Sequence, residues 1–397
     1  MKFSKRIQSI QPSMTLAVDA KAKKLRASGI DVIGFGAGEP DFNTPDKIKQ
    51  AGIEAIEKNS THYTPVGGIE ALKQAIVDKF RRDNNLVYEK NQVLVSCGAK
   101  HSLFNLAQVL WEEGDEIIVP SPYWVSYPDI IRYAGAKPVI IDTLGENQFK
   151  ITPDQIESVV TPSTRAIIIN SPSNPTGSAY SKKELEAVAE CALRNKLLIV
   201  SDEIYEKIVF DGFEQCSICS LDREVQDNSV LINGVSKSYA MTGWRIGYLA
   251  ASEEIVKQTG KLQGQSTSNP TSISQSASIV ALNQGEADVQ FMVEEFQRRR
   301  DALVECLLGI PAVACYKPVG SFYTFPDFSA FYGRSFKGEK VEGSIQLAEF
   351  LLSEGNVALV PGIAFGADKN LRMAFASSMD TIKQGVAQIM KTLELLE

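Results

Sequence analysis

Short apolar runs alternate with amphipathic stretches through the middle of the chain. The runs occupy residues 93–95, 116–119, 139–141, 166–169, 197–200 and 230–232. They are rich in β-branched residues and do not alternate with polar ones, which is typical of strands covered on both faces. The pattern therefore predicts an α/β fold: a mostly parallel sheet that lies between two layers of helices.

The flanking segments predict helices and a second, smaller domain. Helical periodicity is found at residues 14–28, 46–58 and 69–82, and a long charged helix follows residue 281. Beyond Pro311 come short strands, a helix near residues 344–353 and a last amphipathic helix from about Met379. We expect an N-terminal arm with part of a small domain (1–45), a large domain (46–285) and a small α+β domain (286–397).

Composition excludes several classes of protein. The 397 residues carry a net charge of −7 without a basic block, so nucleic acid is not an expected partner. No apolar run is long enough for a bilayer, and the first residues lack the apolar core of a signal peptide. Six scattered cysteines suit a reducing cytoplasm, and with only two histidines no metal site is expected.

Lys237 follows the last apolar run and precedes Arg245 by eight residues. Ligands of open α/β sheets bind beyond the carboxyl ends of the strands. A lysine held there beside a second cation has a lowered pKa and can attack carbonyl groups. The hypothesis is that Lys237 forms a Schiff base; the alternative is an ordinary loop lysine.

Polar residues follow other predicted strands as well. Asp202 comes after residues 197–200 and needs a positive partner if it is buried, although it could equally cap a helix. Tyr205 would share a face with Asp202 in a helical turn. Asn174 lies in a loop stiffened by two prolines, which either orients its amide toward a ligand or simply forms a turn.

Other residues suit an anion or a flat ring. Gly98, Ala99 and Lys100 open a helix, whose N-terminus favours phosphate, although glycine there also serves a turn. Ser236 and Arg245 can both bind phosphate. Trp124 could stack on an aromatic ligand or pack in the core.

Arg372 stands in an apolar strand and needs an anion: either a substrate carboxylate or an internal salt bridge. Taken together, these residues describe a ligand with a phosphate, a ring nitrogen, a phenolic oxygen and an aldehyde. That combination is pyridoxal 5′-phosphate, which enzymes hold through a lysine and an acidic partner of the ring nitrogen.

Longer motifs in the chain resemble those of the class I/II pyridoxal-phosphate-dependent aminotransferases, and most closely the bacterial aspartate aminotransferases. The matching segments are residues 38–42, 63–68, 121–127, 170–177, 201–205 and 236–247, with Arg372. The resemblance implies the type I fold, with a seven-stranded sheet in the large domain. It also implies a cytoplasmic homodimer with shared active sites that acts on amino acids and 2-oxo acids.

The resemblance assigns roles to the cofactor-binding residues. Lys237 would carry the Schiff base and shuttle the proton, Asp202 would pair with the ring nitrogen, and Tyr205 and Asn174 with the phenolic oxygen. Trp124 would stack on the ring. The phosphate would be held by Gly98, Ala99, Lys100, Ser236 and Arg245, and by Tyr63 from the second subunit.

The resemblance also implies how the substrate binds. Arg372, Asn174 and the backbone of Gly38 would hold its α-carboxylate against Trp124. The Lys100 side chain would bind the distal carboxylate of a dicarboxylic substrate, with Ser13 and Thr15 closing over it. The expected reaction converts L-aspartate and 2-oxoglutarate to oxaloacetate and L-glutamate.

The alternatives are an aromatic, glutamate or prephenate aminotransferase of the same fold, and outside that class a non-catalytic regulator or binding protein. Relatives that act on prephenate have a basic residue where this chain has Gln11. That difference argues against prephenate as a substrate.

Overall fold

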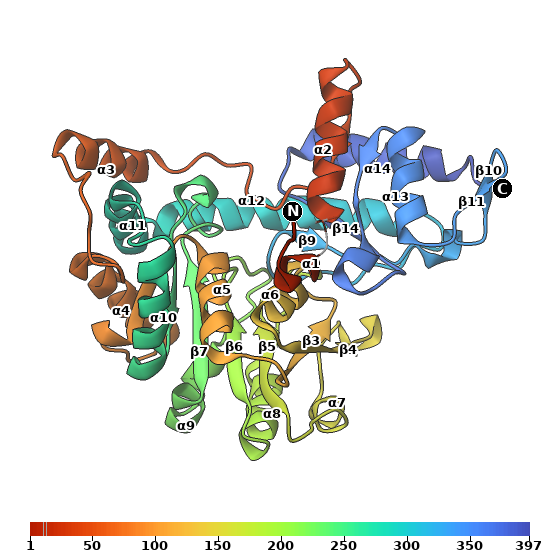
Figure 1. Ribbon diagram of the computed structural model, residues 1–397. Helices are drawn as coiled ribbons and strands as arrows, with labels where there is room; N and C mark the ends of the chain where they lie inside the picture. The colour runs from red at the N-terminus through yellow and green to blue at the C-terminus, as the bar shows by residue number, and fades with distance from the viewer. Residues whose placement is uncertain (11, 13) are drawn as a thin grey trace.

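A seven-stranded sheet forms the centre of the larger part of the molecule (Figure 1). The computed structural model describes residues 1–10, 12 and 14–397, so Gln11 and Ser13 lie outside the described residues. All neighbouring strands are parallel except at β8, which is antiparallel to both its neighbours. The order is β2 (Val93–Ser96), β8 (Gly247–Ala250), β7 (Ser229–Gly234), β6 (Leu198–Asp202), β5 (Thr164–Asn170), β3 (Glu116–Ser121) and β4 (Lys137–Asp142). The predicted α/β class and mostly parallel sheet are confirmed.

Successive residues of these strands enter two different hydrophobic cores. Ile118 points into one core and its neighbours Ile117 and Val119 into the other, and all three are fully buried. This two-sided burial is the physical reason for the continuous apolar runs. The first core is covered by α4 (Glu70–Asn84), α8 (Lys182–Arg194) and α11 (Ser272–Gln284), and the second by α5 (Ala99–Leu110), α6 (Ser126–Ala134) and α10 (Glu253–Ser266). Two short helices, α7 (Pro153–Glu157) and α9 (Arg223–Asp227), precede β5 and β7.

A third core belongs to the C-terminal part of the chain. The three-stranded sheet there has the order β13 (Val360–Pro361), β14 (Leu371–Ala374), β9 (Tyr323–Thr324), all antiparallel. Helices α13 (Ser344–Ser353) and α14 (Met379–Leu393) bury their apolar faces in this core. A two-stranded ribbon, β10 (Ser335–Phe336) and β11 (Glu339–Lys340), lies near the C-terminus (Figure 1).

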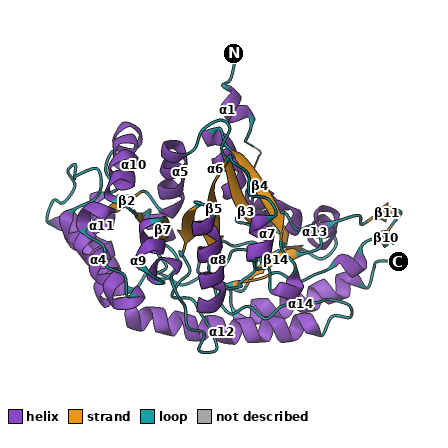
Figure 2. Ribbon diagram, turned by 90° about the horizontal axis from the view of Figure 1, so that it is seen from below, coloured by secondary structure: helices purple, strands orange, loops and turns teal. Residues whose placement is uncertain are grey.

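The long helix α12 (Glu286–Leu308) joins the two parts of the molecule (Figure 2). Its N-terminal residue Val289 packs in the first core, whereas Phe296 and Leu303 pack in the third. The N-terminal segment also reaches the C-terminal part: β1 (Ile33–Gly34) pairs in parallel with β12 (Val357–Ala358), and Ala22 of α2 (Met14–Ala27) packs near them. Helices α1 (Lys5–Gln8) and α3 (Asp46–Glu57) complete the N-terminal region. The boundaries at residues 45 and 285 stay a prediction.

The structure differs at three places from what the sequence suggests. The apolar residues 31–37 suggest one strand, but only the two-residue β1 forms, because Gly34 and Gly36 weaken a longer one. Trp124 lies in the loop before α6 and does not begin that helix. Asp202 is the last residue of β6 and not a helix cap, so Tyr205 follows in a turn.

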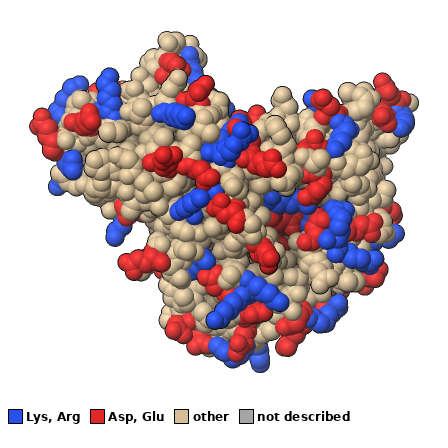
Figure 3. All heavy atoms as spheres, turned by 180° about the vertical axis from the view of Figure 1, so that it is seen from behind, with Lys and Arg blue, Asp and Glu red and all other residues tan. Residues whose placement is uncertain are grey.

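The surface shows no concentration of one charge on the face seen in Figure 3, where acidic and basic side chains are interspersed. Among the helices of the described residues, none is both long and apolar enough to cross a membrane.

Candidate active site

A cavity of about 510 Å³ opens at the carboxyl ends of the parallel strands, between the large and the small sheet. Strand ends and loops from both parts of the chain supply its walls, as the rule for open α/β sheets requires. The structure brings most of the predicted site residues together here: Thr15, Gly38, Ala99, Lys100, Trp124, Asn174, Asp202, Tyr205, Ser236, Lys237, Arg245 and Arg372.

Lys237 reaches the cavity from the turn after β7. Its Nζ donates a hydrogen bond to the carbonyl oxygen of Gly38 and lies 6.0 Å from the Tyr205 ring centre. Burial lowers the pKa of Lys237 to about 8; the charge of Glu39 opposes this and those of Arg372 and Arg245 reinforce it. Burial is thus the main cause, ahead of the neighbouring cation that the sequence suggested. A lysine of this kind is partly neutral near physiological pH and can act as a nucleophile or base.

Asp202 ends the neighbouring strand and is buried. Its Oδ2 accepts a hydrogen bond of 2.7 Å from the Tyr127 hydroxyl, and its Oδ1 one of 3.3 Å from the backbone of Ile204. Burial raises the pKa of Asp202, although the hydrogen bond from Tyr127 opposes the shift. A cationic group of a ligand would relieve the cost of this buried carboxylate.

The start of α5 forms a cradle with Arg245. Gly98, before the helix, has φ +95°, and a Cβ there would lie 2.5 Å from Nη2 of Arg245. A Cβ on Gly247 would lie 2.1 Å from the backbone nitrogen of Ala99. Arg245 is fixed by donating to the carbonyl of Thr242 at 2.7 Å. Close backbone approach, a helix N-terminus and a guanidinium together suit a phosphate.

Arg372 comes from β14 and is almost fully buried. Its guanidinium contacts two aromatic rings, 4.5 Å from the centre of Tyr323 and 5.1 Å from that of Phe365. Nη1 donates to Asn174 Oδ1 at 3.1 Å and Nη2 to the Gly36 carbonyl at 2.8 Å. Its Nε is buried without a hydrogen-bond partner, and among the described residues the side chains whose charges act on it are Tyr323 and Tyr205, not carboxylates. Such a guanidinium is suited to an anionic ligand.

Lys100 and Trp124 form one wall of the cavity. The Nζ of Lys100 lies 4.8 Å from the Trp124 ring centre, and burial, with the charge of Arg245, lowers the pKa of Lys100. Trp124 meets Tyr127 edge to face, with ring centres 5.3 Å apart.

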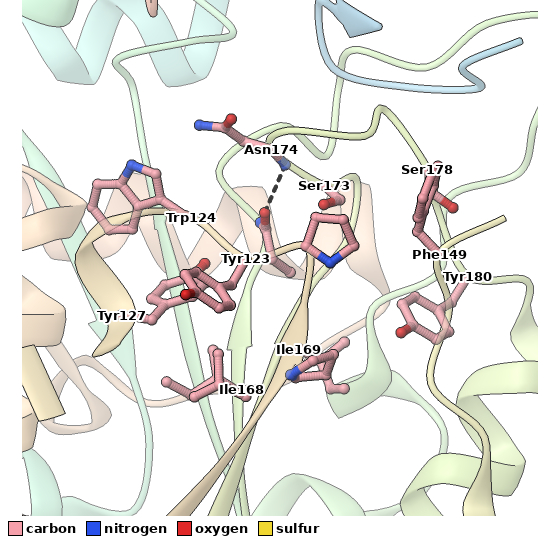
Figure 4. A pocket seen from close by; sticks show the side chains of 14 residues that line it. Tyr123, Trp124, Tyr127, Phe149, Ile168, Ile169, Ser173, Asn174, Ser178 and Tyr180 are labelled. Carbon is pink, nitrogen blue, oxygen red and sulfur yellow. Dashed lines mark hydrogen bonds between the residues drawn. The ribbon is translucent and has the colours of Figure 1, made fainter. Parts of the chain in front are cut away.

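Behind this wall, Figure 4 shows Trp124 and Asn174 on one side of a small cavity, with Tyr180 and Phe149 on the other. The Asn174 backbone nitrogen donates to Asn170 Oδ1 at 2.9 Å (Figure 4), and Asn170 Nδ2 donates to the Asp202 carbonyl at 2.9 Å. The Asn174 loop is therefore tied to the strand end that carries Asp202.

Two predicted residues lie elsewhere. Gly98 stands behind Ala99 and Arg245 and does not line the cavity itself. Tyr63 is 93% exposed and borders a separate groove with His62 and Asn269, so its own chain does not bring it to Lys237.

Sequence reasoning missed two tyrosines of the site, Tyr127 and Tyr323. Tyr127 stands three residues after Trp124 in the same segment, so a helical turn would have placed both rings on one face. Tyr323 begins a short strand directly after the buried Phe322. In the sequence, only the alternation of side-chain directions along a strand could have indicated that Tyr323 faces the cavity.

The cavity combines one buried carboxylate with several cations, namely Lys100, Lys237, Arg245 and Arg372. One ligand can meet all three features: a phosphate for the cradle, a cationic ring nitrogen for Asp202 and an aldehyde for Lys237. The Nε of Arg372, which has no hydrogen-bond partner, is suited to a substrate carboxylate. The fold and the site thus define a pyridoxal-phosphate-dependent enzyme of the type I fold.

The chain belongs to the aminotransferase class I and II family, whose model matches residues 30–389. It is 48% identical to an aspartate aminotransferase of Geobacillus stearothermophilus, over 99% of each chain. An aspartate/prephenate aminotransferase of Nitrosomonas europaea is 46% identical, over 99% of this chain and 100% of its own.

Solved structures agree in fold. The aspartate aminotransferase of Rhizobium meliloti superimposes with a TM-score of 0.97 at 40% identity and covers 100% of both chains. That of Thermus thermophilus with maleate has a TM-score of 0.93 at 38% identity, over 99% of this chain and 100% of the other. Pyridoxal phosphate is the cofactor of this family, and the cavity described above fits it.

Proposed function

We propose that this chain catalyses transamination between L-aspartate and 2-oxoglutarate, yielding oxaloacetate and L-glutamate. One observation carries the proposal: Lys237, with its lowered pKa, shares a cavity with the buried Arg372, whose Nε has no partner, and with a further cation, Lys100. Two cationic groups, one deep and one on the cavity wall, suit a substrate with two carboxylates.

The residues around Lys237 take roles in cofactor binding. Ser236, Arg245 and the backbone of Ala99 and Lys100 would hold the phosphate, Asp202 would accept a hydrogen bond from the ring nitrogen, and Tyr205 and Asn174 would face the phenolic oxygen. When bound, pyridoxal phosphate supplies an electron-withdrawing ring that stabilises negative charge at the substrate's α-carbon. The Lys237 amine would take the proton from that α-carbon and deliver it to the cofactor carbon that carries the aldehyde.

Arg372 binds the α-carboxylate of the substrate, with Asn174 and the Gly38 backbone beside it. Its two neighbouring rings and two hydrogen bonds hold the guanidinium in one plane, which suits bidentate recognition of a carboxylate. Trp124 packs over the ligand and limits access of water.

Lys100 binds the second carboxylate. It lies on the cavity wall against Trp124, and Thr15 of α2 lines the same cavity. The Thermus thermophilus relative was solved with maleate, a dicarboxylate, which supports a dicarboxylic substrate here. Ser13 is assigned to the same end of the substrate by resemblance alone, since it lies outside the described residues.

The enzyme is proposed to act as a cytoplasmic homodimer. The six cysteines are all unpaired, which suits a reducing compartment. Tyr63 is 93% exposed, and two apolar residues of the preceding helix α3, Ile53 and Ile56, are 48% and 54% exposed. In a homodimer, Tyr63 from the second subunit would reach the phosphate.

A panel of amino donors against 2-oxoglutarate tests the substrate assignment. We expect the highest kcat/KM for aspartate. In Lys100→Met, the KM for aspartate should rise about tenfold or more, while the KM for phenylalanine should change little.

The same panel with prephenate as the amino acceptor tests the second candidate function, which is suggested by the relatives named for both aspartate and prephenate. A higher kcat/KM for an aromatic donor than for aspartate, or equal effects of Lys100→Met on both donors, would contradict the proposal.

A further inference from the structure

We propose that Tyr323 is a positioning residue that couples the two ends of the active site: its hydroxyl orients Tyr205 and its ring orients Arg372. The inference rests on the roles proposed above for Tyr205 at the phenolic oxygen of the cofactor and Arg372 at the substrate carboxylate. It adds a residue that makes both roles depend on one side chain.

The hydroxyl contact joins the two sheets of the molecule. The hydroxyl oxygens of Tyr205 and Tyr323 lie 3.2 Å apart, and both side chains are buried. Tyr205 stands in the turn after β6 of the large sheet, and Tyr323 is the first residue of β9 in the small sheet. Among the described residues, Tyr323 is the one hydrogen-bond partner of the Tyr205 hydroxyl.

The ring contact follows from strand register. Tyr323 pairs with Ala374 across the β9–β14 ladder, and Arg372 is two residues from Ala374 on the same face. Diagonal neighbours at this spacing are within reach of long side chains. The guanidinium of Arg372 accordingly lies 4.5 Å from the centre of the Tyr323 ring, and 5.1 Å from that of Phe365.

The chemistry of hydroxyl groups fixes the direction of the hydrogen bond. A tyrosine hydroxyl has one proton, so if Tyr205 donates it to a phenolic oxygen, Tyr205 can only accept in its contact with Tyr323, and Tyr323 is the donor. A hydroxyl that accepts one hydrogen bond donates another more strongly. The rest of the Tyr205 ring is enclosed edge to face by Phe322 and Tyr323, at ring-centre distances of 5.4 and 5.9 Å, so the hydroxyl has little freedom to turn elsewhere.

The hydroxyl contact and the ring contact of Tyr323 can be removed separately by substitution. Tyr323→Phe removes the hydroxyl and keeps the ring beside Arg372, whereas Tyr323→Leu removes both. Tyr88→Phe is the matched control, since it removes a buried phenolic hydroxyl beside Phe80, in the first core and outside the cavity. The readouts are the pH midpoint of the visible absorbance of the cofactor-loaded enzyme, the affinity of the apoenzyme for pyridoxal phosphate, and KM against kcat for aspartate.

We expect Tyr323→Phe to shift the absorbance midpoint by about 0.5 to 1 pH unit in the same direction as Tyr205→Phe. In the Tyr205→Phe background the same change should add no further shift, and it should leave the KM for aspartate within about twofold of wild type. Tyr323→Leu should in addition raise that KM about tenfold, because the guanidinium loses one of its two aromatic neighbours.

Four results would overturn the inference. The absorbance midpoint could shift equally in Tyr323→Phe and in the Tyr88→Phe control, or the shift from Tyr323→Phe could add fully to that of Tyr205→Phe. Either result would show that the two hydroxyls act independently, while the role of Tyr205 would stand. An unchanged KM in Tyr323→Leu would show that the ring does not orient Arg372. An unshifted midpoint in Tyr205→Phe would reject the proposed role of Tyr205, and the coupling with it.

Discussion

At the scale of the residue, the site contains ionisable groups whose pKa values are shifted by burial. Burial lowers the pKa of Lys237 and raises that of Asp202, and the two side chains face one cavity. Groups perturbed in this way cost stability and are concentrated at functional sites.

The cost of Lys237 has a definite dependence on pH. In the unfolded chain its amine is protonated up to pH about 10, whereas in the folded chain it loses its proton near pH 8. The folded state therefore disfavours the ammonium form, and the cost is full below pH 8, shrinks as the pH rises further and is gone above about 10.5.

Replacing Lys237 with methionine, which has nearly the same length, should make the cofactor-free protein more stable at pH 7, by at most about 3 kcal/mol. The gain should vanish as the pH approaches 10.5. Denaturant unfolding of both proteins across this range measures it. A variant that is less stable at pH 7, or equally affected at all pH values, would contradict the lowered pKa.

Sequence predicted which charged residues line the cavity better than it predicted how they are held. Lys237, Asp202 and Arg372 were found because a charged residue in or after an apolar strand needs a partner. Tyr127 and Tyr323 were not, because a tyrosine in an apolar segment looks like an ordinary core residue and only the pairing of distant segments brings their hydroxyls to Asp202 and Tyr205.

At the scale of the element, the same reasoning explains which strands could be predicted. Apolar runs identified β2 to β7, although the edge strand β4 is only partly buried, whereas β8 (Gly-Tyr-Leu-Ala) is too mixed in composition to stand out. Its antiparallel course depends on the return of the chain through residues 235–246, which carry Lys237 and Arg245. The strand of this sheet that sequence predicted least well, β8, is thus the one whose Gly247 lets the start of α5 approach closely and form the phosphate cradle.

A substitution at Gly247 of β8 tests whether the cradle binds the phosphate. Its missing Cβ leaves room for the backbone of Ala99, and an alanine there would force the start of α5 outward. We expect Gly247→Ala to weaken binding of pyridoxal phosphate to the apoenzyme roughly ten- to hundredfold, as overpacking of a close contact implies. Absorbance titration measures the affinity. The control is Gly243→Ala, since a Cβ at Gly243 meets no atom within 4 Å; equal effects of the two changes would contradict the role of the cradle.

At the scale of the whole molecule, the cavity lies where two separately packed parts meet. Helix α12 contributes side chains to the first core of the large part and to the third core of the C-terminal part. The resemblance of motifs correctly implied the sheet and the family. It could not show how α12 spans the molecule, because that depends on which face of a long charged helix meets which core.

The exposed Tyr63 leads to a prediction about assembly. Sedimentation should give a mass near twice the 43.5 kDa of one chain, and Tyr63→Phe should weaken binding of pyridoxal phosphate about tenfold, because a hydrogen bond to a charged phosphate is lost. The titration used for Gly247→Ala measures this effect. A monomer that binds the cofactor tightly, with no change in Tyr63→Phe, would contradict the shared site.

The central claim is that Lys237 is the residue through which this chain binds its cofactor and moves the substrate proton. The direct measurement is turnover of aspartate with 2-oxoglutarate by the cofactor-loaded Lys237→Ala enzyme, with its visible absorbance recorded on the same sample and Lys261→Ala, an exposed change on α10, as control. We predict a loss of turnover of at least about a thousandfold, an altered absorbance in Lys237→Ala, and neither effect in Lys261→Ala. Turnover in Lys237→Ala near the wild-type rate would contradict the claim.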